Sequence, residues 1–305
     1  MKNINIGYGE FEASEISLGC MRMADLSLKT ARSVIETALA CGINFFDHAD
    51  IYGGGESETI FAKAIDMKPS VREKMLLQSK CGIREGYFDF SRDHILASVE
   101  GILKRLKTDY LDVLLLHRPD TLVEPDEVAE AFSRLHSSGK VRHFGVSNQN
   151  PMQMMLLSRY LGQRIIINQL QLSMTNTGMI DAGINVNMEI DPSINRDGSV
   201  LDYCRLNDIT IQAWSPFQYG FFEGVFLDNP KFQKLNEVID RVAADYDVPS
   251  IAIAIAWILR HPARIQPIIG TMNQDRIKAA CQASDISLTR QEWYELYRAA
   301  GNELP

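Results

Sequence analysis

Eight short apolar segments recur along the chain, each followed by polar residues and then by a stretch with helical spacing. Their residues are nearly continuously apolar instead of alternating with polar ones, which is typical of strands buried on both faces of a parallel sheet. The segments predict strands over residues 16–19, 43–47, 75–80, 111–117, 141–147, 165–169, 209–214 and 266–270.

The stretches between these segments carry the start signals of helices. Ser27 precedes a helical pattern over 28–40, and Ser91 precedes another over 92–107, each in the position of an N-cap. Strands alternating with helices in 305 residues predict an α/β fold, a single (β/α)8 TIM barrel domain over residues 1–305. The alternative is an open doubly wound sheet, which usually carries G-x-G-x-x-G after its first strand, and this chain lacks that motif.

Three segments lie outside the repeating units. We expect residues 1–15 to form an N-terminal hairpin that closes the bottom of the barrel, and residues 288–300 to form an extra C-terminal helix. The stretch 171–199 is long, polar and rich in Asn, Asp and Gly, so that a structureless loop is expected there. From its length and position alone we hypothesise that it acts as a lid over cofactor or substrate.

Composition narrows the class of protein. With 31 basic and 39 acidic residues the net charge is −8, which argues against binding of nucleic acid or an anionic membrane. The longest apolar run, 251–259, is far shorter than the roughly 20 residues of a membrane span. Five separated cysteines without a C-x-x-C pair indicate neither a metal site nor disulfides. We expect a cytoplasmic monomer or small homo-oligomer with reduced thiols.

Four polar side chains are predicted at one rim of the barrel. Asp47 ends the second strand, Lys80 the third and His117 the fourth, and Tyr52 lies in the loop after the second strand. Each of them alone has an ordinary structural role, as a turn former, a solvated amine, a packed ring or a hydrogen-bonded imidazole. Because catalytic residues of such barrels come from the C-terminal ends of the strands, their joint position indicates an active site.

A tyrosine beside a lysine suits proton transfer. The ammonium is expected to lower the pKa of the Tyr52 phenol and make it a general acid, while Asp47 holds Lys80 in place. His117 is suited to orient a carbonyl oxygen by hydrogen bonding. Together these groups fit protonation of a carbonyl oxygen while a hydride reaches the carbon, and the hydride has to come from a nicotinamide cofactor.

The chain resembles the aldo-keto reductase superfamily over nearly its full length, and its motifs are similar to those of bacterial oxidoreductases with poorly defined substrates. The segment 46–53, FDHADIYG, matches the signature D-x-A-x-x-Y-G, and H-R-P-D at 117–120 and the segment 138–148 are also characteristic. The resemblance implies NADPH-dependent reduction of aldehydes or ketones to alcohols. It places the catalytic tetrad at Asp47, Tyr52, Lys80 and His117.

The resemblance also implies residues that bind the cofactor. Ser147, Asn148 and Gln169 match residues that bind the nicotinamide carboxamide, and Trp214 stands where an aromatic ring stacks on the nicotinamide. Toward the phosphates it implies, in chain order, Ser215, Pro216, Phe217, Gly270, Thr271 and Arg276.

Two departures from the family pattern concern the phosphate end. Gly270 and Thr271 replace a common Lys-Ser pair, and Ala280 replaces an Asn four residues after Arg276. A helix starting after Thr271 is expected to present backbone N–H groups to the 2′-phosphate, with Arg276 gripping it. NADPH is therefore the expected cofactor, with NADH possible.

The expected substrate is a small carbonyl compound, and the candidate lining residues suggest one that is fairly apolar. Those residues are Met23, Tyr87, Phe88, Arg118, Phe217 and Tyr219. Arg118 has two interpretations: it favours an anionic group on the substrate, or it is a structural residue of the H-R-P motif.

Two other functions are compatible with a barrel of this kind. A cofactor-bound redox sensor or binding subunit of the same fold, with little turnover, is the main alternative, although the complete tetrad argues against it. A metal-dependent hydrolase is disfavoured because no H-x-H pair follows the first strand.

Overall fold

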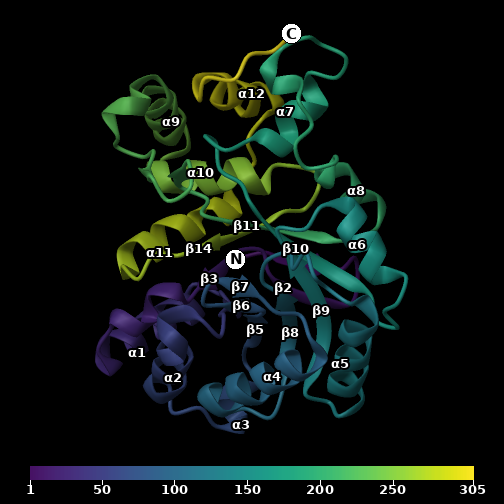
Figure 1. Cartoon of the computed structure of the whole chain (residues 1–305). Coiled ribbons are helices and arrows are strands. Elements are labelled where there is room, and N and C mark those ends of the chain that lie inside the picture. The colour runs from purple at the N-terminus through teal and green to yellow at the C-terminus, as the bar shows by residue number, and fades with distance from the viewer.

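Eight parallel strands close into a barrel in the computed structural model, which describes residues 1–305 (Figure 1). Around the barrel the order is β10, β11, β14, β3, β4, β5, β8 and β9, and each predicted strand is confirmed to within about two residues. The strands are β3 (Ser17–Gly19), β4 (Phe45–Asp47), β5 (Leu76–Cys81), β8 (Leu111–Leu116), β9 (Val141–Ser147), β10 (Ile165–Gln171), β11 (Thr210–Trp214) and β14 (Gln266–Ile269).

Helices surround the barrel, and several of them bury one face against the strands, while α7, α9 and α12 pack mainly against other helices (Figure 1). In α1 the buried residues Ala31, Val34, Ile35 and Ala38 follow helical spacing. The helices are α1 (Leu28–Ala40), α2 (Glu56–Ala64), α3 (Pro69–Arg72), α4 (Arg92–Leu106), α5 (Pro125–Ser137), α6 (Pro151–Ser158), α7 (Gly178–Ile184), α8 (Val200–Leu206), α9 (Gln233–Tyr246), α10 (Ser250–Leu259), α11 (Gln274–Cys281) and α12 (Arg290–Ala299).

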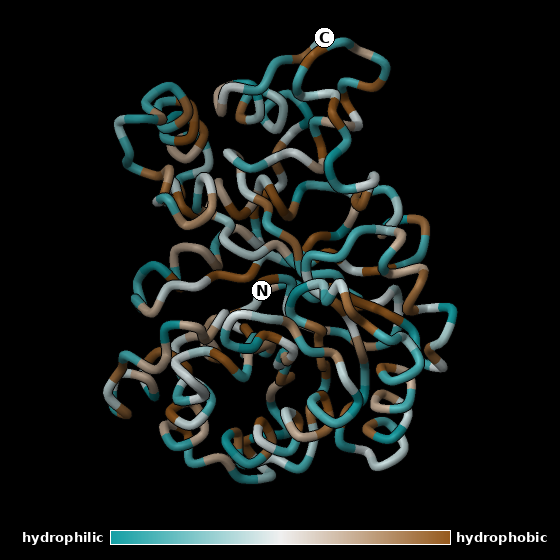
Figure 2. Tube along the Cα trace, in the orientation of Figure 1, coloured by the Kyte–Doolittle hydropathy of each residue, from teal (hydrophilic) through white to brown (hydrophobic).

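The predicted helix starts are confirmed by their hydrogen bonds. The hydroxyl of Ser27 accepts from the backbone N–H of Thr30 at 3.2 Å, and that of Ser91 accepts from the N–H of His94 at 3.4 Å. These contacts satisfy N–H groups that have no partner within the first turn. Figure 2 shows hydrophobic residues along the central strands and hydrophilic residues on the outer helical turns, as burial of one helix face requires.

The predicted hairpin closes the N-terminal end of the barrel. Strands β1 (Asn3–Ile6) and β2 (Phe11–Ser14) pair antiparallel. Their inward residues Ile4, Ile6 and Ala13 belong to a small apolar cluster with five side chains of the barrel strands, namely Phe45, Val113, Leu115, Ile166 and Ile167. The hairpin thus closes the barrel at the N-terminal ends of its strands, and the C-terminal ends remain available for an active site.

The stretch 171–199 is not the structureless loop that composition suggested. It contains α7 and a 3-10 turn at Asp191–Ser193, and Figure 1 shows α7 beside α12. The Tyr297 hydroxyl of α12 donates to Asp181 Oδ1 at 2.6 Å. The expectation was wrong because α7 is held by residues more than a hundred positions away. The lid hypothesis stays a prediction.

No single helix has both the length and the apolar character needed to cross a membrane. Pro230–Tyr246 and Ser250–Leu259 meet those criteria only when taken together, and they are bent by 91° relative to each other.

Candidate active site

The four residues of the predicted tetrad come together at the C-terminal end of the barrel. Asp47 ends β4, Lys80 lies near the end of β5, and His117 directly follows β8. Because side chains alternate along a strand, Lys80 faces the barrel interior, while its neighbour Ser79 faces outward and donates to Glu58 Oε1 of α2 at 2.6 Å.

Tyr52 is positioned by a glycine turn. It opens the 3-10 turn Tyr52–Gly55, in which Gly53 has a φ of 58°. A Cβ on Gly53 would lie 2.4 Å from the Cβ of Ala24, so that this close approach requires glycine. The Y-G pair of the sequence motif therefore holds the phenol over the barrel end.

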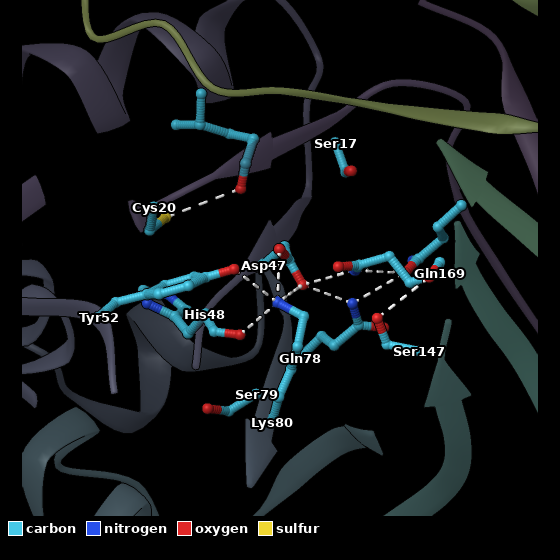
Figure 3. A network of polar contacts seen from close by, with 12 residues as sticks. Ser17, Cys20, Asp47, His48, Tyr52, Gln78, Ser79, Lys80, Ser147 and Gln169 are labelled. Atoms are coloured by element: carbon cyan, nitrogen blue, oxygen red, sulfur yellow. Dashed lines mark hydrogen bonds and ion pairs between the residues drawn. The ribbon is translucent and has the colours of Figure 1, made fainter. Parts of the chain in front are cut away.

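The Lys80 ammonium is the centre of the site (Figure 3). Its Nζ lies 2.8 Å from both carboxylate oxygens of Asp47 and 3.1 Å from the hydroxyl oxygen of Tyr52. It also donates to the backbone carbonyl of His48 at 2.8 Å. Lys80 is fully buried, so all of its donor capacity is directed to these partners.

Burial and charge set the protonation states. Burial raises the pKa of the Tyr52 phenol above 10.0, and Lys80 opposes this rise without reversing it. The expected lowering of the Tyr52 pKa was therefore wrong in its net direction, because the sequence does not reveal how far the phenol is removed from water. Burial acts to lower the pKa of Lys80, but Asp47 and Tyr52 favour the ammonium more strongly and its pKa is raised.

His117 faces the phenol from the end of β8, which is separated from β4 by β5. The two rings are nearly perpendicular, with centroids 6.0 Å apart. Burial, together with the charges of Lys80 and Arg118, lowers the pKa of His117 well below its ordinary value. The imidazole is therefore neutral near pH 7 and keeps one N–H donor.

Sequence analysis missed a network of glutamine side chains below Asp47. The amide nitrogens of Gln78 and Gln169 lie 2.6 Å and 3.0 Å from Asp47 Oδ1. Both also donate to Gln212 Oε1, at 2.8 Å and 3.1 Å. Gln212 donates to Gln266 at 2.8 Å, and Gln266 donates to a backbone carbonyl of the N-terminal hairpin at 2.7 Å.

This network replaces part of the apolar filling that is usual inside such barrels. Gln169, Gln212 and Gln266 are register partners on three adjacent strands, and Gln78 is the partner of Asp47. The available signal was a glutamine in each of four strand segments that are otherwise largely apolar, 75–80, 165–169, 209–214 and 266–270. A buried glutamine needs partners, so a polar inner layer was foreseeable, but its pairing was not.

The residues assigned to the nicotinamide carboxamide form a connected row beside the tetrad. Ser147 Oγ donates to the Gln169 carbonyl at 3.0 Å, and Asn148 Nδ2 donates to Ser147 Oγ at 2.7 Å. The indole N–H of Trp214 donates to Asn148 Oδ1 at 3.1 Å. The row connects Gln169, which donates to Asp47 of the predicted tetrad, to the indole ring of Trp214 at the end of β11.

The loop after β11 covers Trp214. Ser215, Pro216 and Phe217 lead into the short hairpin β12 (Gln218–Tyr219) and β13 (Gly224–Val225). At its tip Phe222 stacks on Trp214, with centroids 5.8 Å apart and planes 23° from parallel. Phe221 is largely exposed and Phe222 about half exposed, so this hairpin borders the barrel end rather than the core.

At the expected phosphate end, Gly270 and Thr271 connect β14 to α11. Asn273 caps α11, and its Oδ1 accepts from the N–H groups of Asp275 and Arg276 at 2.9 Å and 3.0 Å. Two of the N–H groups expected for the 2′-phosphate are thus already occupied. The Arg276 guanidinium is exposed and makes no ion pair, which leaves it free to bind an anion.

Comparisons with known proteins agree with this fold and residue pattern. Residues 15–300 match the family described as "Aldo/keto reductase family". The chain is 36% identical to the oxidoreductase YcsN of Bacillus subtilis, with 97% of each chain covered, and 39% identical to the oxidoreductase YdhF of Escherichia coli, with 96% of each covered. It is 35% identical to a 6-dehydroglucose reductase of Agrobacterium fabrum, with 95% of each covered.

Solved structures show the same fold. A thermostable aldo-keto reductase in complex with the inhibitor epalrestat has a TM-score of 0.78 at 24% identity, covering 98% of this chain and 100% of that one. An aldo-keto reductase of Bombyx mori in complex with NADP has a TM-score of 0.74 at 22% identity, covering 98% and 92%.

Proposed function

The chain belongs to the aldo/keto reductase family, and we propose that it reduces small aldehydes or ketones to alcohols with a nicotinamide cofactor, NADPH in preference to NADH. The observation that carries this proposal is the 3.1 Å contact between the Tyr52 hydroxyl and the buried Lys80 ammonium, itself paired with Asp47. This geometry supplies a protonated phenol beside a fixed positive charge. We treat residues 1–305 as one catalytic domain.

The residues present fit a nicotinamide nucleotide. The amide and hydroxyl row of Ser147, Asn148 and Gln169 would bind the carboxamide, and the Trp214 ring would lie against the nicotinamide. The phosphates would be held by the remaining assigned residues, Ser215, Pro216, Phe217, Gly270, Thr271 and Arg276. Arg276 is free for this role because no carboxylate pairs with it.

Each side chain near the substrate carbonyl has a separate role in the proposed reduction. A bound reduced nicotinamide supplies hydride for the carbonyl carbon. Tyr52 donates its proton to the carbonyl oxygen, and Lys80 stabilises the tyrosinate that remains. Asp47 keeps Lys80 charged and in place. Neutral His117 donates a hydrogen bond that orients the oxygen and offsets its developing negative charge.

The test is the absorbance of NADPH or NADH during incubation with a panel of aldehydes, ketones and quinones. Oxidation of NADPH by several aldehydes is the expected result. Tight NADPH binding without turnover would instead support the redox sensor. If the protein neither binds NADPH nor turns over any of these compounds, both functions are rejected.

A further inference from the structure

Arg118 is the first residue of the loop that follows His117, and the structure decides between its two interpretations. Its guanidinium takes part in no ion pair and in no hydrogen bond with the rest of the chain. A structural arginine of this protein looks different: Arg72 is buried and binds Asp112 at 2.6 Å, together with two backbone carbonyls. The structural interpretation of Arg118 therefore has no hydrogen bond or ion pair to support it.

Burial distinguishes Arg118 from the other arginines without a polar partner. Arg118 is half-buried, and burial lowers the pKa of its guanidinium. The other unpartnered arginines are all exposed and solvated: Arg159, Arg196, Arg264, Arg276, Arg290 and Arg298. A partly desolvated cation without a counter-charge raises the free energy of the protein, and binding of an anion would offset that cost.

The surroundings of Arg118 leave its donors available. Its Cζ lies 5.6 Å from the ring centroid of Trp214 and 5.9 Å from that of Phe221. Aromatic rings attract the cation but satisfy none of its N–H donors. The titratable groups that interact with it are Tyr52 and His117, the two that contact the carbonyl oxygen in the proposed mechanism. No carboxylate is among them.

Arg118 lies on the substrate side of the barrel. In the closed strand order, three strands separate β8 from β14 in either direction, so that Arg118 and the phosphate end near α11 are diametrically opposed. A cofactor that extends from Trp214 to Arg276 would bring its uncharged nicotinamide end near Arg118 and keep its phosphates away, which leaves the guanidinium to an anionic group of the substrate. The position next to His117 places any bound anion a few bonds from the reacting carbonyl.

We propose that Arg118 binds an anionic group of the substrate, so that this enzyme acts on short carbonyl compounds carrying a carboxylate or a phosphate. The proposal rests on the proposed carbonyl reduction and names its substrate class. Arginine suits both anions because its planar donors match two oxygens at once. It differs from the expectation of a fairly apolar substrate, which was based on the aromatic and methionine side chains among the candidate lining residues.

The test compares matched substrates and variants. The substrates are succinate semialdehyde against butanal, and glyceraldehyde phosphate against glyceraldehyde, since each pair differs mainly in its charge. Wild type should favour at least one anionic member by about 10-fold or more in kcat/KM, and which pair shows this identifies the anion. Arg118→Met should reduce that preference about 10- to 100-fold, mainly through KM, and Arg118→Lys should restore part of it.

Arg290→Met is the matched control, because Arg290 is an exposed, unpartnered arginine at the start of α12. It should leave the preference unchanged. An equal loss for charged and neutral substrates in Arg118→Met, or a wild type that favours the neutral members, would overturn the proposal. So would a loss of NADPH affinity in Arg118→Met as large as the loss of substrate affinity.

A binding measurement separates this proposal from the proposed reduction. Succinate cannot be reduced by hydride, and its binding at Arg118 should change the fluorescence of the neighbouring Trp214, with Trp214→Phe identifying the source. If no carbonyl compound is turned over but succinate changes the signal in wild type and not in Arg118→Met, reduction fails and the anion site stands. If neither succinate nor inorganic phosphate changes the Trp214 fluorescence of wild type, the proposed anion site is rejected.

Discussion

The amide nitrogen of Gln78 lies 2.6 Å from Oδ1 of Asp47, so that the carboxylate is held from inside the barrel while Lys80 holds it from above. A carboxylate with 4% of its side chain exposed needs such donors, because a buried charged group without hydrogen-bond partners costs free energy. The position of the Tyr52 hydroxyl, the proposed proton donor, thus depends through Lys80 and Asp47 on a glutamine two residues before Lys80 on the same strand.

Replacement of Gln78 by methionine should reduce turnover. The variant removes one of the two amide donors to Asp47, so the ion pair with Lys80 loses its fixed position, and kcat should fall about 10- to 100-fold. Stability should fall by about 1–3 kcal/mol in urea unfolding. Gln266→Met is the control: it breaks the network two amides away and should cost similar stability with a much smaller change in kcat. Equal losses of kcat would show that only the fold was affected.

Removal of the phenol hydroxyl should abolish most of the reduction. Tyr52→Phe lacks the proton donor, and kcat should fall about 10²- to 10⁴-fold. The NADPH dissociation constant, measured by fluorescence titration, should stay within a few-fold of wild type because Tyr52 is not among the assigned cofactor residues. Turnover close to wild type in this variant would remove Tyr52 from the mechanism.

The raised pKa of Tyr52 predicts the pH profile of reduction. The active form of the acid is protonated, and its pKa lies above 10.0. The pKa of His117 is well below its ordinary value, so that His117 does not change charge near neutral pH. We expect kcat to be nearly constant from about pH 6 to about pH 9 and to fall only at more alkaline pH. A decline centred near neutral pH, measured with saturating NADPH, would contradict this assignment.

Arg276 should control the choice between NADPH and NADH. Its exposed, unpaired guanidinium is the charged group assigned to the 2′-phosphate, which NADH lacks. Arg276→Ala should weaken NADPH binding about 10- to 100-fold and change NADH binding little. Calorimetric titration with both nucleotides is the measurement. Equal weakening of both would show that Arg276 does not bind this phosphate.

Asp50 should make stability depend on pH. Burial, with Glu58 adding to it, raises the Asp50 pKa from 3.8 to about 6, and its Oδ1 has no hydrogen-bond partner. Between these values the folded state keeps a proton that the unfolded state has lost, so stability falls as pH rises and stays lower above about 6. Asp50→Asn cannot ionise and should gain up to about 3 kcal/mol relative to wild type above that pH.

Urea unfolding of wild type and Asp50→Asn at a series of pH values measures this difference. The advantage of the variant should be smallest near pH 4 and grow up to the folded pKa of about 6. A difference that is constant with pH, or that grows toward acid, would mean that Asp50 is ionised in the fold at neutral pH.

The sequence by itself determined the barrel and the gathering of the four residues of the proposed tetrad at one end of it. Continuous apolar strand segments, caps such as Ser27 and Ser91, and polar residues at strand ends are local patterns, and they need no knowledge of distant contacts. The parallel order then placed Asp47, Lys80 and His117 at one rim, since that is where the C-terminal ends of such strands meet.

Only the tertiary structure decided the contact partners, the burial and the pKa shifts of these residues. Period-two spacing says which face of a strand a residue occupies, but not which side chain meets it across the barrel, so the contact of Gln78 with Asp47 could not be predicted. The upward shift of the Tyr52 pKa and the unpaired state of Arg118 depend on burial and on the absence of counter-charges. Both are properties of all neighbours in space, and the closed barrel fixes those neighbours.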